Sequence, residues 1–153
     1  MNSPESRLQA IEDRLALEDV LIAYCSAIDS LSDMDGLLAC FTEDAVFDLG
    51  GIDLPRFDGH DGIRGFFTQV FEDMSHHAHF ITNFQVKSLQ ANDAHCTAYI
   101  IGMGRAHDGR EILVYVHYFL DFVRTDAGWK IKKFGETGLM PLPPELTGVH
   151  GRD

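Results

Sequence analysis

The stretch "LIAYCSAIDSLSDMDGLLACFTEDAVFDLGG", residues 21–51, decides most of the fold. Its first part is apolar around almost the whole helical circumference, which predicts a helix that is buried on two sides and ends near Asp29. "SDMDGLLACF" then predicts a short second helix, capped by Ser32 or Asp33. "EDAVFDLGG" is typical of a strand that ends in a glycine turn. Two helices and a strand are therefore expected to meet within this one stretch.

The segments on either side extend this pattern. "SPES" predicts the start of the first helix, because Ser3 can cap it and Pro4 suits its first turn. "LPRFDGHDG" predicts a loop, "GIRGFFTQVFEDM" a third helix, and "MPLPPELTG" an irregular proline-rich tail. We expect four strands between that helix and the tail, near residues 76–88, 94–105, 110–124 and 128–138. Helices followed by a long antiparallel sheet predict an α+β fold, with the helices on one face of a curved sheet.

Alternation along "EILVYVHYFLDFV" predicts which side chains of this strand face the core. The even positions are all apolar: Ile112, Val114, Val116, Tyr118, Leu120 and Phe122. The odd positions are mixed: Glu111, Leu113, Tyr115, His117, Phe119 and Asp121. Because successive side chains point to opposite faces, we expect the even face to pack in a core and the odd face to line a partly polar cavity.

Size and charge limit the classes of protein. The 153 residues suit a single domain, 1–153, with a core at about 5–138 and a C-terminal tail at 139–153. A formal net charge of −12 disfavours nucleic acids and anionic membranes as partners, since both require a basic surface. The three cysteines form no CxxC motif, and the N-terminus is polar, so we expect reduced thiols in a cytoplasmic protein with no membrane span.

The stretch "SHHAHFITNF", residues 75–84, places three histidines in four positions and has three interpretations. His77 and His79 would share one face of a strand and could bind a metal ion, with His117 or Asp29 as a third ligand. The histidines could instead be exposed or structural, as we expect for His76 and His77. Alternatively, one imidazole is a general base, because it titrates near neutral pH.

The Asp29 carboxylate bears on the third interpretation. A buried carboxylate requires a cationic or hydrogen-bonding partner, and a histidine that faces the helix from the sheet would supply one. Asp29 could equally be an ordinary residue of the helix end or of the turn that follows. The other histidines, His60, His95, His107 and His150, are expected at the surface.

The chain resembles the SnoaL-like branch of the nuclear transport factor 2-like superfamily. The resemblance covers most of residues 5–138 and rests on the order of "LIAYCSAIDSLSDMDGLLACFTEDAVFDLGG", "FDGHDGIRGFF" and "DAGWKIKKF". It implies a strongly curved mixed, mostly antiparallel sheet that forms a cone-shaped barrel with an internal pocket. It also implies a homodimer or homotrimer.

Among the enzymes of this superfamily, the chain resembles scytalone dehydratase, hexachlorocyclohexane dehydrochlorinase and bile-acid dehydratases. The resemblance implies an Asp–His dyad of Asp29 in "SAIDSLSD" and His79 in "HFITN", and Tyr24 as a group that polarises a substrate oxygen. The chain departs from scytalone dehydratase, because the region "YIIGMGRAHDG" offers only Arg105 or, loosely, His107 in place of a second histidine, and Ile28 replaces the tyrosine before the aspartate.

These features predict a lyase of the dehydratase or dehydrohalogenase type that requires no cofactor, or else an isomerase or cyclase. The substrate would be a small hydrophobic cyclic or aromatic molecule, bound by Phe47, Phe67, Phe71, Leu113, Tyr115, His117 and Phe119. The alternative is a non-catalytic ligand-binding protein, or a module similar to the small subunit of a ring-hydroxylating oxygenase. Asp29 and His79 would then be structural.

Overall fold

The computed structural model describes residues 2–151. Its elements are α1 (Pro4–Ser30), α2 (Met34–Ala39), β1 (Phe41–Asp48), the 3-10 turn η1 (Gly50–Ile52), β2 (Arg56–Asp58), α3 (Gly59–Asp73), β3 (Met74–Leu89), β4 (Asp93–Ala106), β5 (Glu111–Thr125), β6 (Gly128–Gly138) and α4 (Pro144–His150). The four long strands predicted from alternation and turn signals are confirmed, within two residues at each end. Within the described residues, no helix has the length and hydropathy that crossing a bilayer requires.

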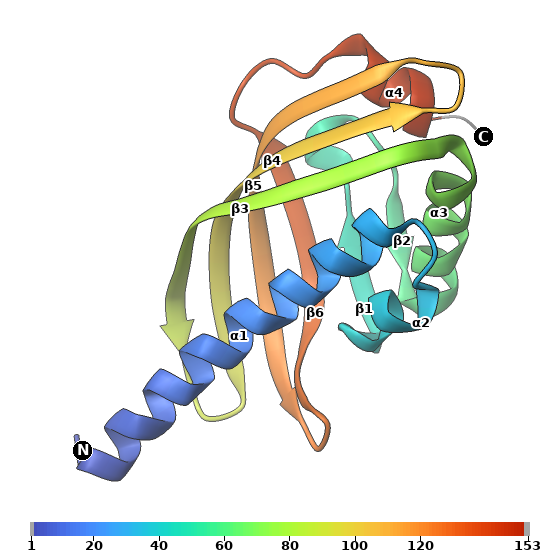
Figure 1. Cartoon of the computed structure of the whole chain (residues 1–153). Coiled ribbons are helices and arrows are strands. Elements are labelled where there is room, and N and C mark those ends of the chain that lie inside the picture. Colours follow the sequence, from blue (N-terminus) through green and yellow to red (C-terminus); the bar gives the residue numbers. More distant parts are fainter. Residues whose placement is uncertain (1, 152–153) are drawn as a thin grey trace.

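The strands form one mixed sheet in the order β2-β1-β6-β5-β4-β3. β1 pairs with β6 in parallel, and all other neighbours are antiparallel. The sheet curves around α1, which crosses it, while α3 and α4 lie at one end (Figure 1). In the described part of the chain β2 and β3 remain edge strands, so the predicted cone is an open sheet rather than a closed barrel.

The core lies between the helices and the curved face of the sheet. The even-numbered residues of β5 point into it, as predicted, and Leu120 is fully buried. The three cysteines are buried in the core, as predicted, and none of them is in a disulfide within the described residues. The prediction that the second half of α1 is buried on two sides was wrong. Ile22 is 45% exposed, because only the face of α1 that meets the sheet is covered.

Two short elements were not predicted. Residues 56–58, expected in a loop, pair with β1 as an edge strand, and α3 then begins at Gly59. The tail, expected to be irregular, contains α4. Pro144 suits its first turn, and Leu146 and Val149 lie three residues apart on its buried side.

Strand β3 contains an irregularity that separates its two halves. Its pairing register with β4 shifts between Thr82 and Gln85, and Asn83 has a positive φ of 52°. Asparagine adopts this left-handed conformation more readily than most residues, and such a bulge bends a strand. The first half of β3 therefore runs across the C-terminal end of α1, and the second half turns away along β4 (Figure 1).

The N-terminal half of α1 is held to the sheet by a buried polar cluster around Asp13, which is 6% exposed. Its carboxylate accepts hydrogen bonds from Arg124 Nη2 (2.8 Å), Trp129 Nε1 (3.2 Å) and Gln9 Nε2 (3.2 Å). The Arg124 guanidinium also stacks on the Trp129 ring, 4.4 Å from its centroid. Burial acts to raise the Asp13 pKa, but the bonds from these donors outweigh it and lower the pKa below its ordinary value of 3.8.

We expect Asp13→Asn to lower the free energy of unfolding by about 2–3 kcal/mol at pH 7, because Arg124 loses its buried partner. The lowered pKa means that the stabilisation is present above pH 3.8 and is lost as pH falls through the folded-state value. Urea unfolding of the wild type and of Asp13→Asn, from pH 7 down to pH 3, measures their unfolding free energies. The difference between the two free energies should become smaller toward pH 3. The exposed Asp19→Asn is the matched control; an equal loss in both variants would contradict the role of the cluster.

Candidate active site

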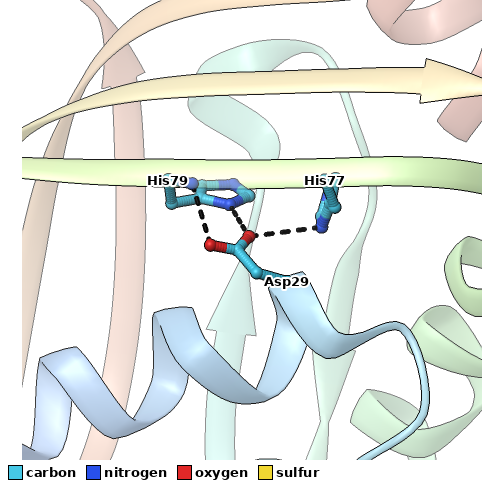
Figure 2. A group of neighbouring side chains, drawn as sticks. All are labelled: Asp29, His77 and His79. Atoms are coloured by element: carbon cyan, nitrogen blue, oxygen red, sulfur yellow. Dashed lines mark hydrogen bonds and ion pairs between the residues drawn. The ribbon is translucent and has the colours of Figure 1, made fainter.

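The last turn of α1 and the first half of β3 bring Asp29 and His79 together. His79 Nδ1 lies 2.6 Å from Asp29 Oδ1, and the His79 backbone N–H donates to Asp29 Oδ2 at 2.9 Å. Figure 2 shows the carboxylate rising from the end of α1 toward the strand. One aspartate therefore fixes both the ring and the backbone of the histidine.

The contact with Asp29 determines which ring nitrogen of His79 is free. An ionised carboxylate only accepts hydrogen bonds, so Nδ1 must carry the proton and Nε2 the lone pair. This Nε2 edge lies over Gly102 on β4, where a Cβ added to the glycine would stand 3.4 Å from Nε2. The basic nitrogen therefore points away from Asp29, toward strand β4 and the cavity that His79 and Gly102 both line.

His77 lies beside this pair but has a different environment. Its Nδ1 donates to the Ile28 carbonyl at 3.0 Å and is 3.7 Å from Asp29 Oδ1 (Figure 2). Burial, with the nearby His79, lowers the pKa of His77 to about 4. His77 is therefore neutral near pH 7 and adds no positive charge beside His79.

The two imidazoles and Asp29 also meet the simplest condition for a metal site, since their ligand atoms lie within 4.8 Å of one another. Each Nδ1 atom, however, already donates to an oxygen, at Ile28 and at Asp29. A metal ion bound through these atoms would have to break both bonds. The two Nδ1 atoms are therefore available to a metal ion only if these hydrogen bonds break.

Two glycines on β4 make room for the two rings. In the β3–β4 register Gly102 is opposite His79 and Gly104 is opposite His77. A Cβ at position 104 would lie 3.2 Å from His77 Cδ2 and closer still to the Met74 side chain. Both rings thus have space to lie against β4 and border the cavity next to it.

A cavity of about 80 Å³ lies under the curved sheet. Most of its lining is apolar, from Phe47, Phe67, Val70, Val114 and other core side chains. Its titratable lining residues are Tyr24, Tyr118, His77, His79, Glu136 and His150. Such a site suits a small hydrophobic molecule that carries few polar groups.

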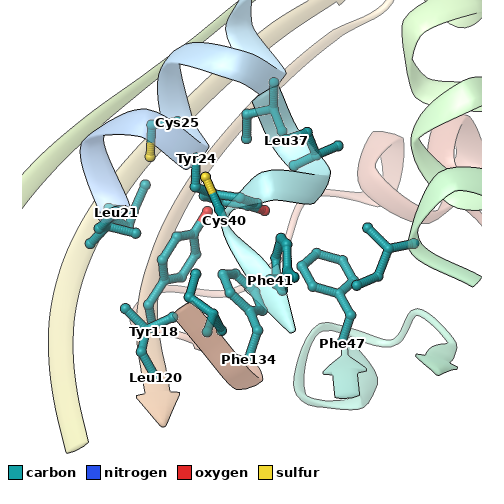
Figure 3. Packing of buried hydrophobic residues seen from close by; sticks show 14 of the residues in the cluster. Leu21, Tyr24, Cys25, Leu37, Cys40, Phe41, Phe47, Tyr118, Leu120 and Phe134 are labelled. Carbon is teal, nitrogen blue, oxygen red and sulfur yellow. The ribbon is translucent and has the colours of Figure 1, made fainter. Parts of the chain in front are cut away.

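Tyr24 has the features of a core aromatic residue and also lies where the resemblance implies a group that polarises a substrate oxygen. It is 2% exposed and packs against Phe41, Phe47 and Phe134, as a core aromatic residue does (Figure 3). It also lines the cavity and forms a side-chain hydrogen bond with Tyr118. Burial raises its pKa well above 10, so its hydroxyl keeps its proton.

The predicted lining of the cavity was correct for Phe47 and Phe67 and wrong for five residues. Phe71 packs on Phe67 outside the cavity. The others lie on the odd-numbered face of β5, which is the outer face of the sheet: Leu113, Tyr115, His117 and Phe119. Leu113 is 47% exposed and Tyr115 42%. The curved sheet encloses its cavity on the concave face, so the even-numbered core residues line it instead.

Sequence reasoning missed three polar residues of the cavity, namely Tyr118, Glu136 and His150. Tyr118 was expected only as a core residue, and His150 was expected at the surface but lines the cavity from α4. Glu136, on β6, had not been singled out, and burial raises its pKa to about 8. His60 is also only partly exposed, since its Nε2 lies 3.0 Å from the Phe41 carbonyl oxygen.

Comparison with known proteins finds a matching family model and similar solved structures. A family model described as a SnoaL-like domain matches residues 9–135. A crystal structure of a Novosphingobium aromaticivorans protein, provisionally described as an aromatic ring hydroxylase, is 53% identical, with a TM-score of 0.86. The match covers 87% of this chain and 93% of that one.

Two more distant structures share the fold. One, provisionally described as a scytalone dehydratase of Novosphingobium aromaticivorans, is 19% identical with a TM-score of 0.78, over 90% of this chain and 89% of that one. The other, a hexachlorocyclohexane dehydrochlorinase of Novosphingobium barchaimii LL02, is 19% identical with a TM-score of 0.76, over 90% and 99%. At this identity the likeness concerns the fold alone.

Proposed function

Because the chain belongs to the SnoaL-like domain family, whose fold is related to dehydratases and dehydrochlorinases, we propose that it is a cofactor-independent lyase. In this proposal His79 removes a proton from a carbon atom of a small cyclic substrate, and Asp29 orients the imidazole. The observation that carries the proposal is the 2.6 Å contact between Asp29 and a histidine that lines an apolar cavity.

The surroundings of His79 support a role as general base. Asp29 fixes the tautomer that leaves Nε2 basic, and its negative charge stabilises the imidazolium formed when the proton is taken. The neutral His77 adds no opposing charge. Because imidazole is a moderate base, the carbon that loses the proton must be activated, as it is next to a ketone.

The cavity restricts the substrate. Its volume of about 80 Å³ and its apolar walls suit a single ring rather than a fused polycyclic molecule. Because the Tyr24 and Tyr118 hydroxyls share one hydrogen bond and both stay protonated, one of them keeps an O–H that can donate to a ketone oxygen and stabilise the enolate that forms. No part of this scheme requires a group that the chain itself does not supply.

The test uses cyclohexanones with a leaving group on the β carbon. We expect purified protein to form cyclohexenone, followed by its ultraviolet absorbance, and to be slower when the α carbon carries deuterium. In D2O the protein should also exchange the α hydrogens of unsubstituted cyclohexanone. A protein that binds these ketones but neither eliminates nor exchanges would contradict the proposal.

A second candidate is a ligand-binding module of a ring-hydroxylating system. It is favoured by the 53% identity to a protein provisionally described as an aromatic ring hydroxylase. This candidate predicts binding of phenols or arenes that is unchanged when His79 is replaced by glutamine, and no hydrogen exchange. Isothermal titration of phenol into both proteins distinguishes the two functions.

A further inference from the structure

The inside of the cavity contains one acidic residue that the Asp29–His79 pair does not use. Glu136 lies on β6 two residues after the buried Phe134, and therefore on the same, inward face. It lines the same cavity as His79. Within residues 2–151 its carboxyl group forms no hydrogen bond or ion pair, and burial is the cause of its raised pKa of about 8.

Most titratable neighbours of Glu136 are neutral at pH 7, so their charge does not stabilise its carboxylate form. The titratable groups that face it or share its cavity come from α1, β3, β5 and α4: Tyr24, Cys25, His77, His79, Tyr118 and His150. Burial raises the pKa values of Tyr24, Cys25 and Tyr118, so these groups are neutral at pH 7. The turn η1 packs its backbone against Glu136, since a Cβ at Gly51 would overlap the Glu136 carbonyl oxygen, and it brings no ionisable side chain.

Glu136 is half-buried and lines the cavity, so a molecule in the cavity can reach its carboxyl group, which has no partner among the described residues. We propose that Glu136 is the general acid of the reaction: it protonates a hydroxyl leaving group, so that the elimination is a dehydration. This inference rests on the proposed lyase function and specifies its leaving group. A halide leaves as an anion and needs no proton, whereas hydroxide is a poor leaving group until it is protonated.

Each of the two groups exchanges one proton with the substrate. His79 Nε2 takes the proton from the carbon next to the ketone, and the electrons of that C–H bond form the C=C bond. The C–O bond on the neighbouring carbon breaks, and the proton of Glu136 passes to the departing oxygen, which leaves as water. Solvent then removes the proton from His79 and returns one to Glu136.

The test compares two leaving groups on one ring. Glu136→Gln keeps the shape of the side chain but has no acidic proton. On β-hydroxycyclohexanone we expect its kcat to fall by about 100-fold or more, the usual contribution of a general acid. On β-acetoxycyclohexanone, whose acetate leaves without protonation, we expect a change of less than about threefold. Glu145→Gln, an exposed glutamate of α4, is the matched control and should match the wild type on both.

The pH dependence gives a second measure. Turnover of the hydroxy compound should fall as pH rises through about 8, where Glu136 loses its proton, and turnover of the acetoxy compound should not. Infrared difference spectra of wild type minus Glu136→Gln should contain a carboxylic acid C=O band that disappears over the same pH range. The pKa of Glu136 is higher in the folded than in the unfolded protein, so the folded state loses stability as pH rises between these two pKa values. Glutamine does not ionise, so Glu136→Gln should melt at a higher temperature than the wild type at pH 8.

The outcomes separate the two proposals. Equal effects of Glu136→Gln on both compounds, no effect on either, or a missing acid band would overturn the role of Glu136 and leave the lyase function standing. A wild type that eliminates acetate but never water would also overturn it. A wild type that is inactive on both compounds and catalyses no hydrogen exchange would remove the lyase function, and this inference with it.

Discussion

Replacing His79 by glutamine should reduce kcat for elimination by about 10³- to 10⁴-fold, because the amide cannot accept a proton from carbon at neutral pH. Glutamine has a similar length and can still donate a hydrogen bond to Asp29, so the helix–strand contact is largely kept. KM should change by only a few-fold, since the apolar walls of the cavity are untouched. Initial rates with β-substituted cyclohexanones measure both constants.

A histidine on the same strand provides the control for this experiment. His76 lies on the opposite, exposed face of β3, so His76→Gln changes the same chemistry at a position outside the cavity. It should keep wild-type kcat. If His79→Gln retains more than a tenth of wild-type turnover while it folds normally, another group is the base.

Replacing Asp29 by asparagine should lower kcat nearly as much as His79→Gln, because Asp29 makes two hydrogen bonds with His79 and asparagine cannot make both. Asp29 accepts from both the His79 ring and the His79 backbone, whereas an amide has one accepting oxygen. If that oxygen accepts the backbone N–H, the amide NH2 faces Nδ1, and the ring proton must move to Nε2. The wrong tautomer then faces the substrate, a change that lowers kcat by about 10⁴-fold in a known histidine-based enzyme.

The other orientation of the amide places its NH2 against the His79 backbone N–H. One buried donor then lacks an acceptor, at a cost of about 1–3 kcal/mol in unfolding free energy. Asp29→Asn is therefore expected to lose either activity or stability, and Asp35→Asn, exposed on α2, to lose neither. Imidazole ¹⁵N shifts report the tautomer, and thermal melting reports the stability. Wild-type values for kcat, tautomer and stability together would contradict the dyad.

Most of the fold could be predicted because its signals are local. Alternation over many residues defines the long strands, and glycine or aspartate turns separate them. The elements that were missed, β2 and α4, span three and seven residues. Over such lengths a period is hard to recognise, and pairing or packing with distant residues decides the structure.

The central pair of the site was predictable only through a resemblance, because the two residues lie fifty positions apart in the sequence. Asp29 and His79 were expected to meet from resemblance to a family, and the structure places them in contact. Glu136 was missed because the alternation of β6 breaks before it: Ile131 and Phe134 both point inward, with two exposed lysines between them. Only the pairing of β6 with β5 reveals that the inward face continues to Glu136.

The bulge at Asn83 has a consequence for how the chain tolerates length changes. A one-residue insertion or deletion moves every following side chain of a strand to the opposite face, until an irregularity absorbs it. His77 and His79 precede the bulge. Indels in the distal half of β3 or in its hairpin with β4 can therefore be accommodated there, and both imidazoles keep facing α1. The same change between His77 and His79 would put the two imidazoles on opposite faces of β3, so natural variation in length should gather beyond Asn83.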